Sequence, residues 1–385
     1  MRKRRNTPVS AVAVSAEAPL KGRQTMQSPF AAGVGGTNFM LSHPNEIPTG
    51  FFTITMRATT PSERRVFIQA LSGAGAAIAI PALALAPQPH IDRPAVQVRV
   101  IPGSGEYIAA VGMGSWLTFD IAGSGNPDFR ADALRAVLQT FFDRGGVLID
   151  TSPMYGSSEQ VIGELLRPGV NAVAGRDRVF AASKVWTIGE AAGRGQMENS
   201  LALWRAGGRS FPGNPSFDLL QIHNMMDWQT HLGTLKTWKA AGRIRYVGIT
   251  TSHGSRSDEL EVAMKRERFD FVQFTYNLTD RRAESRLLPL ARDRGAAVII
   301  NRPFDGGGMF RRTRGKPMPA WATELGCRNW ADFFLKFILS HPAVTCAIPA
   351  TSQASHMAEN MNALLGELPD AGMRRRMVEY WERSA

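Results

Sequence analysis

Residues 148–166 read LIDTSPMYGSSEQVIGELL, and this stretch contains the local pattern that decides the fold. An apolar run ends at Asp150, turn-forming residues follow, and apolar residues then recur at the spacing of one helical face. The stretch therefore predicts a strand over 147–150 and a helix over 159–166.

The same alternation continues along the chain. Helical patterns cover 129–143, 159–166, 229–241 and 328–340, and strands are predicted over 110–114, 147–150, 179–184, 217–223, 244–249, 271–275, 297–301 and 345–349. Short apolar strands separated by amphipathic helices predict parallel βα units, and eight units in about 250 residues match an α/β protein of the (β/α)8 TIM barrel type. A doubly wound sheet is the alternative, but the first strand lacks the Gly-x-Gly-x-x-Gly turn of that fold.

Residues 95–385 are predicted to form this barrel as a single domain. Two short apolar runs, 98–101 and 107–110, flank a Pro-Gly-Ser-Gly turn and predict a β-hairpin that caps the barrel bottom. Another amphipathic helix is predicted over 374–383.

Composition excludes several classes of protein. The formal net charge is +12, but nine Lys/Arg and three Glu in residues 1–86 account for half of it. The rest of the sequence has no stripe of basic residues interleaved with aromatic ones. The barrel is therefore not predicted to bind nucleic acid. Two cysteines exclude a disulfide framework, and the histidines lack ligand spacing, so no metal site and no metal-dependent hydrolase is predicted.

Residues 56–86 resemble a twin-arginine (Tat) export signal. Arg64 and Arg65 are followed by Val-Phe-Ile and a charge-free run to Ala86. A membrane anchor is the alternative, since about 20 apolar residues span a bilayer, but mild hydrophobicity and Pro81 favour a cleaved signal. The resemblance implies the Tat machinery as a partner, transient membrane contact and a periplasmic or exported protein; without cleavage the protein would be cytoplasmic or membrane-anchored.

Residues 1–55 show no sustained periodicity and are interpreted as an unstructured N-terminal extension. Export signals begin at the N-terminus, so we expect Met56 to be the true start of the protein.

Four titratable residues follow three successive predicted strands: Asp150, Tyr155, Lys184 and His223. Taken singly, each has an ordinary structural explanation, such as a helix cap, a rim ion pair or a core histidine. Functional side chains of TIM barrels cluster after the carboxyl ends of strands, however, so their joint placement predicts an active site.

These residues lie in runs that resemble the aldo-keto reductases. The runs LIDTSPMYGSSEQVIGELL, SKVW, DLLQIHN, GRIRYVGIT, VQFTYNL and IPATSQASHMAEN occur in the order of that family and cover roughly residues 98–365. The resemblance implies a TIM barrel that uses NADP, with NAD as the alternative cofactor. It implies an oxidoreductase that reduces an aldehyde or ketone to an alcohol, or catalyses the reverse reaction.

The resemblance also implies roles for the four residues. Tyr155 is the general acid or base, and the Lys184 ammonium lowers the pKa of its phenol. Asp150 holds the lysine in its charged form, and His223 orients and polarises the carbonyl oxygen.

Cofactor contacts are implied with several departures from the family pattern. Gln273 matches the contact to the nicotinamide carboxamide, Asn301 stands where many members stack an aromatic ring, and Ala350 and His356 replace the cations that usually meet the 2′-phosphate. Gly306–Gly308 would let the backbone approach the pyrophosphate, although a flexible loop explains these glycines equally well. The predicted cofactor-binding residues are Thr250, Thr251, Gln273, Asn301, Arg302, Pro303, Phe304, Thr351, Glu359 and Asn360.

Trp116, His223 and Asn224 are predicted to contact the small-molecule carbonyl or alcohol substrate. Trp116, Met225, Met226 and Trp228 would form an apolar wall suited to an aromatic or aliphatic carbonyl compound, and packing within the core explains these side chains equally well. The alternative function is a nicotinamide-cofactor-binding sensor or partner subunit with little turnover, because the stacking aromatic residue is missing.

Overall fold

Eight parallel strands form the barrel. The computed structural model describes residues 96–122, 127–169, 172–205 and 217–383. Neighbouring strands pair in the order of the sequence; they are β3 (Met113–Gly114), β4 (Leu148–Asp150), β5 (Phe180–Val185), β6 (Phe217–Ile222), β7 (Ile244–Thr250), β8 (Phe271–Thr275), β9 (Ala297–Asn301) and β10 (Cys346–Ala347). Parallel bridges Val111↔Ala347 and Gly114↔Ala350 join the first strand region to the last. The predicted TIM barrel is confirmed.

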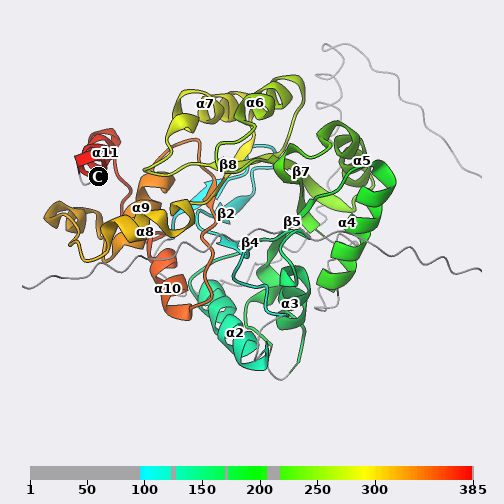
Figure 1. The fold of residues 1–385 in the computed structure, drawn as a ribbon, viewed down its shortest axis with the longest axis horizontal. Helices are drawn as coiled ribbons and strands as arrows, with labels where there is room; N and C mark the ends of the chain where they lie inside the picture. Colours follow the sequence, from blue (N-terminus) through cyan, green and yellow to red (C-terminus); the bar gives the residue numbers. More distant parts are fainter. Residues whose placement is uncertain (1–95, 123–126, 170–171, 206–216, 384–385) are drawn as a thin grey trace, which may run out of the picture. The chain divides into compact units, whose positions relative to one another are not determined.

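Helices surround the strands (Figure 1). They are α2 (Pro127–Asp143), α3 (Ser158–Leu165), α4 (Glu190–Arg205), α5 (Trp228–Ala240), α6 (Ser257–Arg266), α7 (Leu287–Arg294), α8 (Gly308–Thr313), α9 (Trp330–Leu339), α10 (Ala354–Asn362) and α11 (Ala371–Arg383). The α9 helix begins where the side chain of Asn329 accepts a hydrogen bond from the Asp332 N–H at 2.9 Å, the usual N-cap contact. The α7 helix ends at Gly295, whose φ of 67° suits a residue without a side chain.

Two apolar layers hold the barrel together. The larger one lies between the strands and the surrounding helices and includes Phe141, Trp238 and Phe334. The smaller one fills the barrel interior around Phe180 and Phe271. Toward the carboxyl ends of the strands, the interior side chains are polar instead of apolar. The titratable residues at the strand ends lie in this part of the barrel.

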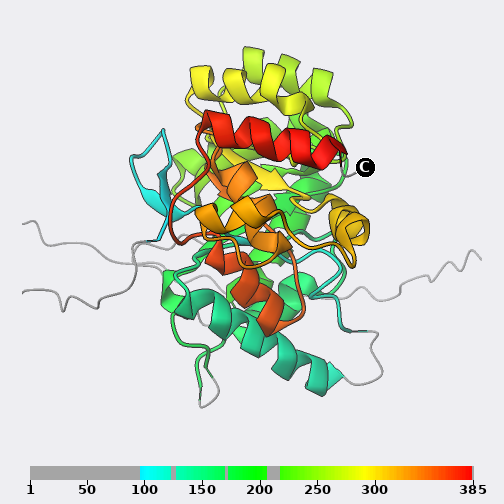
Figure 2. The same ribbon diagram turned by 90° about the vertical axis from the view of Figure 1, so that its left-hand side faces the viewer.

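The predicted hairpin pairs β1 (Val98–Val100) with β2 (Tyr107–Ala109), and Figure 2 shows it in cyan at one end of the barrel. Ile101 and Ile108 insert their side chains into the interior apolar layer. The hydroxyl of Tyr246, in β7, donates a hydrogen bond to Glu106 of the hairpin at 2.7 Å. The hairpin therefore closes the barrel at the amino ends of its strands.

The predicted N-terminal extension (1–55) and signal segment (56–86) lie outside the described residues. Within the part of the chain that is described, no helix is long and apolar enough to cross a membrane.

Candidate active site

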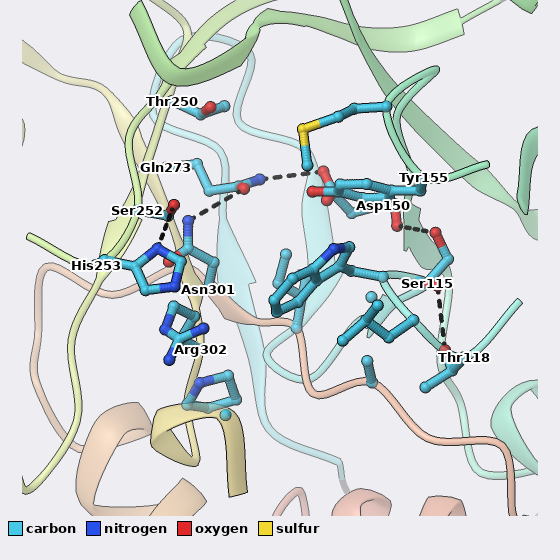
Figure 3. Close-up of a pocket in the computed structure, with 18 of the residues that line it drawn as sticks. Ser115, Thr118, Asp150, Tyr155, Thr250, Ser252, His253, Gln273, Asn301 and Arg302 are labelled. Atoms are coloured by element: carbon cyan, nitrogen blue, oxygen red, sulfur yellow. Dashed lines mark hydrogen bonds between the residues drawn. The ribbon is translucent and has the colours of Figure 1, made fainter. Parts of the chain in front are cut away.

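The carboxyl ends of the strands surround a cavity of about 460 Å³. Figure 3 shows Tyr155 and Ser115 on one side of it and Gln273, Asn301 and His253 on the other. These residues come from segments far apart in the sequence, which is how a TIM barrel assembles a site.

A buried ion pair lies at the floor of the cavity. Lys184 Nζ donates hydrogen bonds to Asp150 Oδ2 at 2.5 Å and to the backbone oxygen of Thr151 at 2.8 Å. Burial lowers the pKa of Lys184, but the charges and hydrogen bonds of Asp150 and Tyr155 together raise it above its ordinary value. The lysine is therefore held as an ammonium ion.

Two amides occupy the other oxygen of Asp150. Gln221 Nε2 donates to Oδ1 at 2.8 Å, and Gln273 Nε2 donates to the same atom at 3.1 Å. Both carboxylate oxygens thus accept hydrogen bonds, as an ionised carboxylate requires in a buried site. Gln221 is absent from the sequence prediction; its signal is a polar residue close to the carboxyl end of β6.

Tyr155 lies next to this ion pair. Lys184 Nζ is 5.1 Å from the centroid of its ring, and the ring meets that of His223 edge-on with centroids 5.6 Å apart. Burial raises the pKa of the phenol, and the lowering effect of the Lys184 ammonium does not overcome it. The lysine acts in the predicted direction, but the net pKa lies above the ordinary value, so the phenol keeps its proton.

His223 follows β6 and is buried. Its Nδ1 lies 2.8 Å from the hydroxyl oxygen of Ser152. Burial, together with the charge of Lys184, lowers the pKa of His223 to about 2. A neutral imidazole can donate a hydrogen bond to a substrate oxygen, but it carries no positive charge that would attract that oxygen.

The predicted cofactor side of the cavity is polar. Six of the ten predicted residues line it: Thr250, Gln273, Asn301, Arg302, Pro303 and Phe304. Asn301 Nδ2 donates to the backbone oxygen of Thr251 at 2.8 Å, and its Oδ1 accepts from Thr275 Oγ1 at 2.7 Å. The residue that stands in place of the family's aromatic ring is therefore anchored to two neighbouring strands.

Gly306 and Gly307 bring bare backbone to the cavity wall. Their φ angles are 58° and 83°, in the left-handed region that residues with side chains avoid. Together with the Arg302 guanidinium, which pairs with Asp305 at 3.6 Å, and the amides of Gln273 and Asn301, this wall offers a cation, glycine backbone and carboxamides. The donor set fits a nicotinamide nucleotide.

The remaining four predicted cofactor residues do not line the cavity. Thr251 is buried, and its hydroxyl donates to the backbone oxygen of Ser255. Thr351 accepts a hydrogen bond from the Gln353 N–H just before α10. Glu359 and Asn360 lie within α10, and contact of these four residues with a cofactor stays a prediction.

The part of the cavity predicted to contact the substrate has fewer of the predicted apolar side chains than expected. Trp116, His223 and Asn224 line the cavity, as predicted. Met225 and Trp228 are buried in the core, so for these two residues packing, and not the apolar wall, is the alternative that holds. The φ angles of Asn224 and Met225 are 51° and 60°, and this turn of the backbone separates the two side chains.

Several cavity residues were not singled out from the sequence; they include Ser115, Leu117, Thr118, Met154, Ser252, His253 and Ser255. Their positions one to six residues after predicted strand ends are the only signal available. Among the described residues, no group of three or more His, Cys, Asp or Glu side chains is placed to hold a metal ion.

Comparison with known proteins agrees with this geometry. The chain is 26% identical over 232 residues to a protein of Escherichia coli (strain K12) named NADH-specific methylglyoxal reductase, and 25% identical over 216 residues to aldo-keto reductase YhdN of Bacillus subtilis (strain 168). Each alignment covers 52% of this chain, and they cover 65% and 60% of those relatives, less than two thirds of their lengths.

A crystal structure of an aldo/keto reductase from Klebsiella pneumoniae in complex with NADP and acetate shares the fold. Its TM-score is 0.59 at 24% identity, and the match covers 75% of this chain and 96% of that chain. The sequence model of the Aldo/keto reductase family matches residues 110–376. Because this match spans well over half of the sequence and contains the whole candidate site, the chain belongs to the aldo/keto reductase family.

Proposed function

We propose that this protein is an NAD(P)-dependent oxidoreductase that interconverts a small aldehyde or ketone and the corresponding alcohol. The observation that carries the proposal is the buried Lys184–Asp150 pair, which lies beside Tyr155 and His223 at the floor of the cavity. Because Asp150 balances its charge, the fully buried Lys184 ammonium needs no bound anion.

Each of the four residues has its own role in the reaction at the substrate oxygen. Tyr155, which keeps its proton, donates it to the oxygen as the carbonyl is reduced. The Lys184 ammonium stabilises the phenolate that remains, and Asp150 keeps the lysine charged and in place. His223 donates a hydrogen bond to the same oxygen. A bound nicotinamide cofactor supplies the hydride.

Gln273, Asn301 and Thr250 would hold the carboxamide of that cofactor, and Arg302 with the backbone at Gly306 and Gly307 would meet its phosphates. NADP is the proposed cofactor, with NAD as the alternative. The replacement of the family's 2′-phosphate cations by Ala350 and His356 weakens the preference for NADP.

The mouth of the cavity supports a substrate with an apolar body. Trp116 and Leu117 line the cavity and remain exposed. Trp186 and Ile188, in the segment after β5, are also exposed, and the Trp186 ring lies 6.5 Å from that of His223. Apolar side chains left in water around a reactive site favour an aromatic or aliphatic carbonyl compound.

The test is a fluorescence titration of the full-length protein with NADPH and NADH, followed by assays with aldehydes and ketones. Tyr155→Phe should lower kcat roughly 10²- to 10⁴-fold, as loss of a general acid does, and leave the nucleotide Kd unchanged. Tyr107→Phe is the matched control, because Tyr107 is exposed on the hairpin at the other end of the barrel.

Wild-type protein that binds nucleotide but turns over no carbonyl would instead favour the cofactor-binding sensor or partner subunit. Protein that binds neither nucleotide would contradict both functions.

We further propose export through the twin-arginine pathway to the periplasm. The support is the sequence of residues 56–86, with Arg64 and Arg65 before an apolar run. Replacing both arginines by lysine should leave the protein in the cytoplasm of a bacterium whose twin-arginine pathway is intact, as judged by cell fractionation. Equal export of the wild type and the double variant would contradict the proposal.

A further inference from the structure

The side chain of Ser152 contacts two residues of the cavity wall, His223 and Met154. It lies in the loop between β4 and α3, and its side chain is fully buried and does not line the cavity. Its hydroxyl oxygen accepts a hydrogen bond from the Met154 N–H at 3.2 Å and lies 2.8 Å from His223 Nδ1.

The direction of the serine–histidine hydrogen bond follows from counting protons. A serine hydroxyl has one proton to donate, and a buried donor needs an acceptor. Among the described residues, His223 Nδ1 is the one acceptor placed to take the Ser152 proton. If Nδ1 carried the ring proton instead, Ser152 would accept two hydrogen bonds, and the proton of its fully buried hydroxyl would lack a partner among the described residues.

His223 is neutral because burial and Lys184 lower its pKa to about 2, so a single ring nitrogen carries a proton. With Nδ1 acting as an acceptor, that proton lies on Nε2. Nδ1 is engaged by Ser152, so Nε2 is the nitrogen left for a ligand in the cavity that the ring lines.

We propose that Ser152 is a positioning residue that fixes His223 in the tautomer with the proton on Nε2. The hydroxyl thereby ensures that the ring presents a donor, rather than a lone pair, to a carbonyl oxygen. This last consequence rests on the proposed function, whereas the tautomer is a property of the protein without any ligand.

The tautomer can be measured directly by NMR. Full-length protein labelled with ¹⁵N-histidine is examined without nucleotide, and the signals of His223 are assigned by their absence in His223→Asn. We expect Nε2 to be protonated in the wild type, and Ser152→Ala to introduce a population with the proton on Nδ1. Ser158→Ala is the matched control, since Ser158 is equally buried and donates only to the backbone oxygen of Ser115 at 3.5 Å.

In the carbonyl assay, Ser152→Ala should reduce kcat roughly tenfold to a hundredfold, by analogy with the loss of hydrogen bonds that orient metal-bound histidines, with nucleotide Kd unchanged. A wild-type ring protonated on Nδ1, or a tautomer unchanged in Ser152→Ala, would overturn the proposal. If Ser152→Ala does not fold, the wild-type spectrum still decides which nitrogen carries the proton. An Nε2-protonated wild type without carbonyl turnover would reject the proposed function and leave the role of Ser152 supported.

Discussion

At the residue scale, a continuous set of hydrogen bonds joins the catalytic pair to the proposed cofactor wall. Lys184 donates to one oxygen of Asp150, Gln273 donates to the other oxygen, and Asn301 Nδ2 lies 3.4 Å from Gln273 Oε1. At the position where many family members stack an aromatic ring, Asn301 instead makes polar contacts that orient the amide of Gln273. A carboxamide that binds there meets a partner already held in place.

Protonation of His223 predicts a pH-dependent stability. The unfolded imidazole binds a proton below its ordinary pKa near 6.5, whereas the folded ring binds one only near 2. Acid therefore favours the unfolded state, and this group should remove about 1.4 kcal/mol of unfolding free energy per pH unit as the pH falls below about 6.5. Urea unfolding of the wild type and His223→Asn at pH 7, 6 and 5 should give a steeper loss in the wild type. Equal slopes would contradict the buried, neutral histidine.

At the element scale, α3 is fixed against two neighbours by one carboxylate and one glycine. Glu159 accepts hydrogen bonds from Ser183 of β5 at 2.5 Å and from Ser200 of α4 at 2.9 Å. Gly163 lets α3 approach α4 closely, because a Cβ at this position would lie 2.2 Å from the backbone oxygen of Leu203. These contacts fix the helix that follows the loop of Ser152 and Tyr155.

Gly163→Ala should destabilise the protein by roughly 1–3 kcal/mol, because a backbone oxygen cannot move aside as a flexible side chain does. The matched control is Gly195→Ala in α4, where a Cβ would meet nothing within 4 Å. There the better helix propensity of alanine should stabilise the protein by up to about 1 kcal/mol. Urea unfolding measures both; a neutral or stabilising Gly163→Ala would show that the two helices can separate without cost.

At the scale of the whole barrel, one end is closed and the other is open. The hairpin fills the amino end with apolar residues, and the cavity opens at the carboxyl end, with the buried Lys184–Asp150 pair at its floor. The closed end excludes water from below Lys184, which keeps the electrostatic interactions of the site strong. The hairpin therefore supports the site although it contributes no side chain to it.

Ile101→Ala should cost about 2–5 kcal/mol of unfolding free energy, because it leaves a cavity among interior side chains that cannot collapse fully. Val98→Ala tests the opposite face of the same hairpin, where the side chain is 42% exposed, and should cost no more than about 0.5 kcal/mol. Similar losses for both variants in urea unfolding would contradict the closing role of the hairpin.

The sequence by itself determined the order of strands and helices, the closing hairpin and the placement of Asp150, Tyr155, Lys184 and His223 near strand ends. Periodicity and spacing along the chain are local properties, and in a parallel barrel the ends of all strands meet at one face. The boundaries of the four helices predicted between the strands came within two residues for the same reason; 129–143, for example, is observed as Pro127–Asp143. The C-terminal helix predicted over 374–383 begins three residues earlier, at Ala371.

Only the tertiary structure decided which side chains form hydrogen bonds with one another and which line the cavity. Gln221 meets Asp150 and Ser152 meets His223 across about 70 residues of sequence, so neither contact has a local signal. The net rise of the Tyr155 pKa likewise depends on burial, which is set by everything packed around the phenol. Spacing can bring functional groups to one end of a barrel, but packing fixes their direction, protonation and partners.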